Sequence, residues 1–329
     1  MKIAIDAMGG DHAPMASVQG TLLAAAQYPD AEFVLVGREP EILSSVAALP
    51  KNVSVLHASD VIDAAAEPVK SVRRQKDSSL VVSATMVRDG MADAMVSAGN
   101  TGAFMVAGLL VVGRMNGIDR PALAAMLPTF SGNPVLLMDA GANTDCTDTN
   151  LLQFAKMGEA YLKVAMGSPH ARVGLINIGA EEGKGNDVCK AAYPRLKDVC
   201  DEFVGNVEAR DLLRGMCDVA VCDGFVGNVL VKFYEGVGVG ILDSLKRMFV
   251  ETLSSKIAAL FLRSRLKLFR NRFDYAEYGG GPFLGVRGVL VKAHGSSNAR
   301  AFHMAISQAC RMHTSGLIHA LERELSVNQ

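Results

Sequence analysis

The feature that most constrains the fold is an alternation of short apolar strands with helical patterns along the whole chain. Eight strand-like runs rich in β-branched residues are separated by segments whose apolar residues recur at helical spacing. The expected strands are 2–7, 32–37, 53–57, 94–98, 134–139, 172–178, 219–222 and 288–293. The alternation predicts an α/β fold of three layers, α/β/α, in which helices cover both faces of a mostly parallel sheet. Because no Pro/Ser-rich linker interrupts the 329 residues, we expect one domain over 1–329.

Six of the expected strands run into short loops of Gly, Asn, Asp and Ser, each followed by a helical pattern. The loops are DAMGGDH (6–12), SAGNTGA (97–103), DAGANTD (139–145), NIGAEEGKGND (177–187), CDGFVGN (222–228) and AHGSSNA (293–299). Any single one is also typical of an ordinary turn, since glycine permits tight turns and Asn, Asp and Ser cap helices. In a parallel sheet, however, all strand carboxyl ends share one edge, where ligands bind. Helix N-termini gathered there favour an anion, so the six loops predict an anion site.

The loop 177–187 indicates phosphate as that anion. Its glycines keep the backbone open, Lys184 supplies a charge, and Asn186 and Asp187 begin the next helix. The loop does not match the Walker A pattern of nucleotide hydrolases, because Gly185 follows the lysine where Ser or Thr is required. A solvated loop lysine is an equally good interpretation of Lys184 taken alone.

A second unusual stretch, YGGGPFLGVRGVLVKAHGSSNARA, covers 278–301. Consecutive glycines and a proline form a turn before a strand that ends near His294. A histidine at a strand end, followed by Ser296, Ser297 and Asn298, can carry a proton or donate to a bound anion. A histidine that only packs in the turn is equally consistent with the local sequence.

Composition excludes several other classes of protein. Lys and Arg number 33 against 34 Asp and Glu, so the formal charge of −1 gives no reason to expect nucleic acid as a partner. Six cysteines without a C-x-x-C pair predict reduced, mostly buried thiols and no zinc site. The N-terminus does not match a signal peptide, and the longest uncharged apolar stretch, 103–113, is too short to span a bilayer. We therefore expect a cytoplasmic protein with no cofactor. No metal ligands are assigned, and the sequence leaves open whether a metal lies near Asp11, His12 or Asp223.

Together these motifs resemble the phosphate acyltransferases of bacterial phospholipid synthesis, the PlsX family. The resemblance rests on MKIAIDAMGGDHAP, VSAGNTGA, DAGAN, NIGAEEGKGN, CDGFVGN and the GGGPFLG…VKAHGSSNA block, and it extends from the first residue to the final helix. It implies transfer of a fatty acyl group from the thioester of acyl carrier protein to inorganic phosphate. The acyl phosphate would then pass to a membrane glycerol-3-phosphate acyltransferase. It also implies a fold like that of phosphotransacetylases and the isocitrate dehydrogenase group.

This chemistry assigns roles to the motif residues. Phosphate is largely a dianion at neutral pH and needs little general-base help, whereas the tetrahedral oxyanion needs preorganised donors. We predict that Lys184 binds phosphate and transition-state charge, that His294 protonates the leaving sulfur or donates to the oxyanion, and that Asp223 orients a catalytic side chain. The other catalytic, phosphate-binding or substrate-binding candidates are Gly9, Gly10, Asp11, His12, Asn100, Thr101, Asn143, Asn186, Asp187, Asn228, Ser296, Ser297 and Asn298. For Asp11 and His12, capping of the next helix remains an alternative.

Residues 241–273 predict a basic amphipathic helical hairpin that turns near Ser254 and Ser255. Eight Lys or Arg against Asp243 and Glu251 give this segment a charge of +6, and apolar residues recur at three- and four-residue steps. The expected surface residues are Leu245, Phe249, Leu253, Ile257, Leu260, Phe261, Arg263, Arg265, Lys267 and Arg270. The hairpin could form a homodimer interface, lie on the inner, anionic face of the membrane, or dock the acidic acyl carrier protein. These uses are compatible with one another.

Other classes of function remain as alternatives. A metal-dependent dehydrogenase of the isocitrate type would need a dinucleotide loop and a carboxylate cluster for Mg²⁺, and the sequence indicates neither. A phosphotransacetylase that uses coenzyme A is the nearest rival. A non-catalytic acyl-binding protein of the membrane surface is the third.

Overall fold

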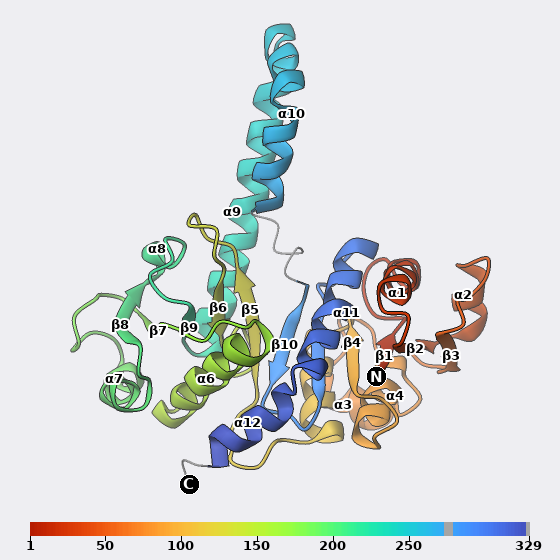
Figure 1. Ribbon diagram of the computed structural model, residues 1–329, viewed down its shortest axis with the longest axis horizontal. Helices are drawn as coiled ribbons and strands as arrows, with labels where there is room; N and C mark the ends of the chain where they lie inside the picture. Colours follow the sequence, from red (N-terminus) through yellow and green to blue (C-terminus); the bar gives the residue numbers. More distant parts are fainter. Residues whose placement is uncertain (273–278, 327–329) are drawn as a thin grey trace.

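The computed structural model describes residues 1–272 and 279–326, and a single mixed sheet runs through them (Figure 1). The described part contains eleven strands in the order β3-β2-β1-β4-β11-β10-β5-β6-β9-β7-β8. Their bounds are β1 Lys2–Asp6, β2 Glu32–Gly37, β3 Val53–His57, β4 Ala94–Ser97, β5 Ala122–Leu127, β6 Val135–Met138, β7 Val173–Asn177, β8 Phe203–Glu208, β9 Val219–Val221, β10 Gly281–Leu284 and β11 Val289–Lys292. All eight expected strands are present, six of them shorter by one residue at one or both ends.

Three strands were not predicted, and each has a sequence that hides it. β5 reads ALAAML, whose Ala, Leu and Met are good helix formers. β10 is four residues long and contains Gly and Pro, and β8 is interrupted by Gly205 and Asn206. Tertiary pairing overrides these local preferences, since β5 lies between β10 and β6 in the middle of the sheet.

The central strands reverse the direction of the sheet. Seven of the ten strand pairings in the described residues are parallel, but β11–β10, β10–β5 and β5–β6 are antiparallel. Because three successive reversals separate β11 from β6, the strands β1, β4 and β11 run opposite to β6, β7 and β9. The expectation that all six glycine-rich loops share one edge is therefore wrong. Three lie at each edge.

Helices cover both faces of the sheet, which confirms the three-layer prediction. Side chains alternate between the two cores, so that Ile3 and Ile5 of β1 enter one core and Ala4 the other. One core is covered by α1 (Met15–Gln27), α2 (Glu39–Ser44), α6 (Asp148–Ala160), α7 (Asp187–Val199), α11 (Ala299–Thr314) and α12 (Leu317–Ser326). The opposite face carries α3 (Pro68–Arg74), α4 (Ser79–Arg88), α5 (Thr101–Ala107), α8 (Ala209–Leu212) and the start of α9 (Gly224–Glu251). Two π-helical turns, Gly108–Val112 and Tyr161–Ala165, continue α5 and α6.

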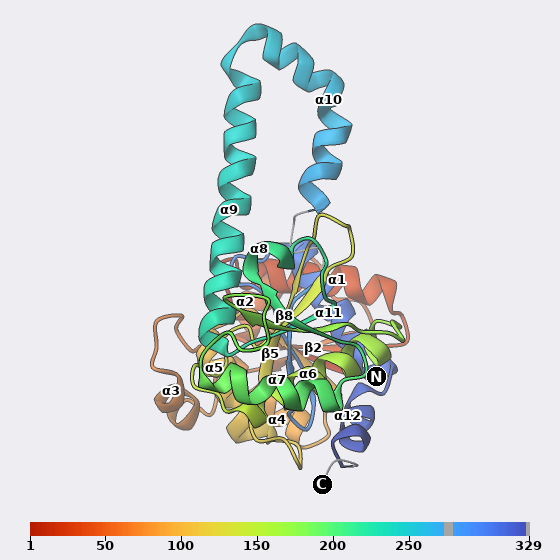
Figure 2. The same ribbon diagram turned by 90° about the vertical axis from the view of Figure 1, so that its left-hand side faces the viewer.

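The predicted hairpin is formed by α9 and α10 (Leu253–Arg272), which project from the body as the two arms of an open hairpin joined at its far end (Figure 2). It is longer than expected, because α9 begins at Gly224, and it turns at Thr252 rather than at Ser254 and Ser255. Leu245 and Phe249 are half-buried. The exposed residues of the predicted surface are Leu253, Ile257, Leu260, Phe261, Arg263 and Arg265. Lys267 and Arg270 belong to α10, but their side chains, like Phe273, lie outside the described part of the chain.

α9 is also the one helix among the described residues that is long and apolar enough to cross a membrane, judged by length and composition alone. The sequence hides this property because Lys232 and Glu235 interrupt the apolar run. In the helix they form an ion pair at 2.9 Å, one turn apart. Almost none of the most apolar stretch of α9 is buried within this chain.

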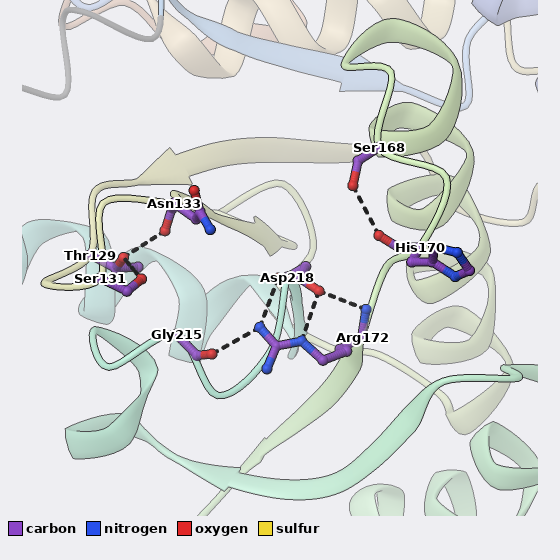
Figure 3. A network of polar contacts seen from close by, with 8 residues as sticks. All are labelled: Thr129, Ser131, Asn133, Ser168, His170, Arg172, Gly215 and Asp218. Carbon is purple, nitrogen blue, oxygen red and sulfur yellow. Dashed lines mark hydrogen bonds and ion pairs between the residues drawn. The ribbon is translucent and has the colours of Figure 1, made fainter.

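The starts of β7 and β9 are joined by a polar network shown in Figure 3. The Arg172 guanidinium donates to both carboxylate oxygens of Asp218, at 3.0 and 2.9 Å, and to the Gly215 carbonyl at 2.9 Å. Burial raises the pKa of Asp218, but the hydrogen bonds from the Arg172 side chain and backbone N–H outweigh it and leave that pKa below its usual value. This bidentate pair ties the start of β7 to the start of β9.

Candidate active site

The candidate active site is a cleft of about 590 Å³ beside the central strand β5. One wall is the first part of α9, and the opposite side is the segment that follows β11. Residues 123–127 of β5 line the cleft, together with Gly279 and Gly280 before β10, Gly281 at its start, and Thr101 and Met105 of α5. Ala140, Gly141 and Asn228, from the segments that follow β6 and β9, also line the cleft. So do residues 292–298, from the end of β11 and the loop that follows it. A single cavity thus joins both halves of the sheet.

The start of α9 is fixed against the loop after β6. Asp223 caps the helix by accepting the N–H of Val226 at 2.8 Å, and the Gly224 N–H donates to the Asn143 carbonyl at 2.7 Å. Gly227 lies so close to Asp139 that a Cβ would stand 1.8 Å from the Asp139 carbonyl oxygen. Asn228 follows directly and lines the cleft. The predicted residue Asp223 therefore positions the helix without lining the cleft itself.

Asp139 organises the loop that faces α9. Its buried carboxylate accepts the N–H groups of Leu123, Gly141, Ala142 and Asn143 at 2.7–3.1 Å. The Asn143 amide donates to Asp139 at 2.9 Å and to the Pro121 carbonyl at 2.8 Å, which commits both of its protons. Asn143 thus holds the loop and does not line the cleft.

Three glycine-rich loops of the first half pack against one another. Cβ atoms at Gly9 and Gly10 would stand 2.5 Å from the Gly99 nitrogen and 3.0 Å from the Gly295 carbonyl oxygen, so both glycines serve close backbone packing. The Asp11 N–H donates to that carbonyl at 2.8 Å. His12 is exposed. None of the four predicted residues 9–12 lines the cleft.

The loops 97–103 and 177–187 contain five more predicted residues, of which Thr101 lines the cleft and the other four do not. Asn100 caps α5, and its amide also holds the carbonyls of 63, 64 and 66, whereas Thr101 beside it lines the cleft. In the loop 177–187, Asn186 caps α7 and Asp187 is the first residue of that helix. Lys184 is exposed there and lies outside the cleft lining. Its role in phosphate binding stays a prediction.

His294 lies in the cleft beside Ser296, Ser297 and Asn298. The Ser296 N–H donates to its Nδ1 at 3.2 Å, with the Ser296 hydroxyl 2.8 Å from the same atom. A neutral ring therefore carries its proton on Nε2, which lies 3.6 Å from a Glu235 carboxylate oxygen across the cleft. Burial lowers the pKa of His294, although Glu235 partly opposes this shift. His294 can therefore act as a neutral N–H donor.

Lys292 is the main functional candidate that the motif analysis did not select. It ends β11, is only 7% exposed, and lines the cleft. Burial lowers its pKa to about 8, against the opposing effect of Asp6 and Asp11. Lys232 and Glu235 of α9 face the same space. The sequence held one signal for Lys292, a charged residue within the otherwise apolar run VLVKA.

None of the six cysteines lines the cleft. All are free thiols, and four are buried. Burial raises the pKa of Cys146 and Cys310 to about 11 and that of Cys200 and Cys217 to about 12. The cleft therefore offers donors and cations for an anionic substrate and no thiolate nucleophile.

The fold of the chain is similar to that of the phosphotransacetylases. The chain superimposes on a phosphotransacetylase from Streptococcus pyogenes with a TM-score of 0.61, covering 97% of this chain and 94% of that one at 15% identity. At this identity the likeness is one of fold alone.

Sequence similarity identifies the family. A family model described as "Fatty acid synthesis protein" matches residues 1–320. The chain is 48% identical to a phosphate acyltransferase of Brevibacillus brevis over 100% of its own length and 98% of the relative's. A phosphate acyltransferase of Bacillus thuringiensis is 47% identical over 95% and 94%. The chain therefore belongs to the phosphate acyltransferase family.

Proposed function

We propose that the protein transfers a fatty acyl group from the thioester of acyl carrier protein to inorganic phosphate. The observation that carries the proposal is the composition of the cleft, where Lys232, Lys292 and His294 share one cavity with the apolar side chains of Leu123 and Met126. Cations and N–H donors suit a phosphate and a developing oxyanion, and apolar walls suit an alkyl chain. The names of the relatives support the same reaction class.

The reaction needs no enzyme nucleophile. A phosphate oxygen attacks the thioester carbonyl carbon, a C–O bond forms, and the carbonyl oxygen becomes an oxyanion. When the carbonyl re-forms, the C–S bond breaks and the thiolate takes up the proton of the attacking hydrogen phosphate. The neutral Nε2–H of His294 is the proposed donor to the oxyanion or the departing sulfur. Asn228 is the proposed second donor on the α9 wall.

The exposed hairpin is the proposed attachment to the membrane. Its basic side chains and the exposed Leu260 and Phe261 suit an anionic surface, to which each Lys or Arg contributes about 1 kcal/mol. A homodimer that pairs two hairpins, or docking of acyl carrier protein on the same basic face, is compatible with this placement. Attachment at the inner membrane face would deliver the acyl phosphate near a membrane glycerol-3-phosphate acyltransferase.

Negative charges introduced at two apolar positions of the hairpin test the attachment. Leu260→Asp with Phe261→Asp should release the protein from anionic phospholipid vesicles, because these side chains are 72% and 85% exposed and would otherwise insert among the lipids. Flotation with vesicles measures the effect. Leu23→Asp with Met91→Asp places the same charges on apolar positions of the body that are 49% and 53% exposed, and this variant should float like wild type. Equal flotation of all three proteins would contradict the attachment.

A comparison of acyl donors tests the proposed substrate. Acyl carrier protein thioester and acyl-CoA are each incubated with the protein, with and without phosphate, and acyl phosphate is trapped with hydroxylamine. We expect phosphate-dependent product with the carrier protein and at least tenfold less with acyl-CoA. Preference for acyl-CoA would instead indicate a phosphotransacetylase. No product from either donor would favour a non-catalytic acyl-binding protein.

A further inference from the structure

The cleft contains a buried cation that the protein leaves largely unpaired. The Lys292 ammonium donates to the Ala293 carbonyl at 2.5 Å, and this is its single hydrogen bond within the described chain. An ammonium has three N–H donors. Among the described residues no carboxylate lies within ion-pair distance of it. The charge of Asp6 raises the pKa of Lys292 without a hydrogen bond between them. The Asp6 oxygens instead accept from the Ser79 and Ser97 hydroxyls at 2.6 and 2.5 Å. A buried cation with unused donors requires an acceptor from outside the chain.

Ser297 provides a second unused donor in the same cleft. Its hydroxyl oxygen is buried and has no hydrogen-bond partner in the described structure, in a residue that is only 6% exposed. Its N–H donates to the His294 carbonyl at 3.0 Å, which fixes the turn between them. Buried hydroxyls are normally paired, so an unpaired one in the same cleft as an unused ammonium points to a ligand.

The backbone around both groups is held in place before any ligand binds. Lys292 is paired with Ser97 of β4 on one side and with Gly281 of β10 on the other. A Cβ at Gly280 would stand 2.5 Å from the Lys292 carbonyl oxygen, so the neighbouring segment packs tightly against it. The Asp11 N–H holds Gly295. Donors fixed in this way bind a charged group with little reorganisation.

We propose that Lys292 and Ser297 together bind the phosphate that accepts the acyl group. This inference rests on the proposed function and assigns to β11 and its following loop the task that the sequence motifs gave to Lys184. The charge of Lys292 and the hydroxyl of Ser297 contact phosphate oxygens. His294, between them in sequence, is left to face the acyl carbonyl.

The electrostatics of the cleft agree with this assignment. The titratable groups that act on Lys292 are Asp6 and Asp11, which raise its pKa, and Lys232, which lowers it. Burial has the largest effect and brings the pKa to about 8, so the ammonium is mostly charged at neutral pH and loses its proton above pH 8. Phosphate is already a dianion in that range. Phosphate affinity should therefore fall as pH rises above 8.

Binding of inorganic phosphate to the full-length protein, measured by calorimetry without any acyl donor, tests the proposal. Lys292→Met keeps the length of the buried stem and should weaken phosphate binding roughly ten- to hundredfold, as expected for loss of a charged hydrogen bond. Ser297→Ala should weaken it about three- to tenfold. Lys51→Met, on an exposed loop, should bind like wild type. Circular dichroism shows whether each variant is folded.

The pH dependence separates a direct role from a structural one. In wild type the KM for phosphate should rise above pH 8, and in Lys292→Arg this rise should disappear, because arginine stays charged. If the two residues instead hold the phosphodiester of the carrier's prosthetic arm, free phosphate will bind both variants normally and only the carrier KM will rise. That result overturns the proposal, as does phosphate binding that is undetectable in wild type.

These measurements distinguish a failure of the phosphate site from a failure of the proposed reaction. If wild type binds phosphate, the variants lose it, and no acyl phosphate forms from acyl carrier protein, the phosphate site stands and the proposed function fails. If acyl phosphate forms and both variants bind phosphate like wild type, the function stands and the site is wrong.

Discussion

Gly227→Ala is expected to destabilise the protein by about 3 kcal/mol or more. The added methyl carbon would stand 1.8 Å from the Asp139 carbonyl oxygen and 2.9 Å from its carbonyl carbon, distances at which backbone must move. Either α9 or the loop after β6 would be displaced, and Asn228 and Lys232 would move with the helix. Urea unfolding at fixed protein concentration measures the change, and acyl transfer should fall together with the stability.

Gly240→Ala is the matched control in the same helix. No atom lies within 4 Å of the Cβ position there, so alanine should stabilise the helix by about 0.5–1 kcal/mol. A loss of stability at position 227 no larger than 1 kcal/mol would contradict the close packing of α9 on the body. A similar loss at both positions would show that the effect belongs to helix glycines in general.

The second large effect is expected for Asp139→Ala, with a loss of about 3–5 kcal/mol. This change removes the acceptor of four backbone N–H groups, those of Leu123, Gly141, Ala142 and Asn143, in a buried site. The loop that carries Ala140 and Gly141 into the cleft would lose its internal support.

Asp139→Asn is the graded comparison for that experiment. It keeps one oxygen acceptor but turns an amide donor toward N–H groups, so we expect roughly half of the alanine effect. Thermal or urea unfolding gives both values. A loss of stability below 1 kcal/mol for Asp139→Ala would mean that the loop is held by other contacts. Equal losses for the two variants would mean that the number of acceptors removed does not determine the loss.

The local features of the fold could be predicted from sequence. β-branched runs identify eight strands, and Asn100, Asn186, Asp223 and Asn298 cap helices as their positions predict. What the sequence hides is long-range pairing. β5, written ALAAML, becomes a strand because β10 and β6 lie beside it, and its antiparallel pairing divides the loops between two edges. The antiparallel pairing of the central strands determines which loops lie at the same edge of the sheet. The sequences of these strands do not indicate that pairing.

The candidate site was predicted in part for the same reason. Thr101, Asn228, His294, Ser296, Ser297 and Asn298 line the cleft, and their roles there stay predictions. Some glycines of these loops have a structural role. Gly9 and Gly10, for example, allow the backbones of neighbouring loops to pack closely. Lys292 was missed because a residue within a strand resembles core sequence. Its charge within an apolar run is the one signal in the sequence, and its burial and unused donors distinguish it in the structure.

The proposed reaction requires phosphate to be the direct acyl acceptor. The decisive measurement supplies acyl carrier protein thioester and phosphate labelled with ¹⁸O at all four oxygens, with mass spectrometry of the products. Direct attack by phosphate on the carbonyl carbon predicts an acyl phosphate that retains all four labelled oxygens. Release of unlabelled fatty acid at a rate independent of phosphate would contradict it.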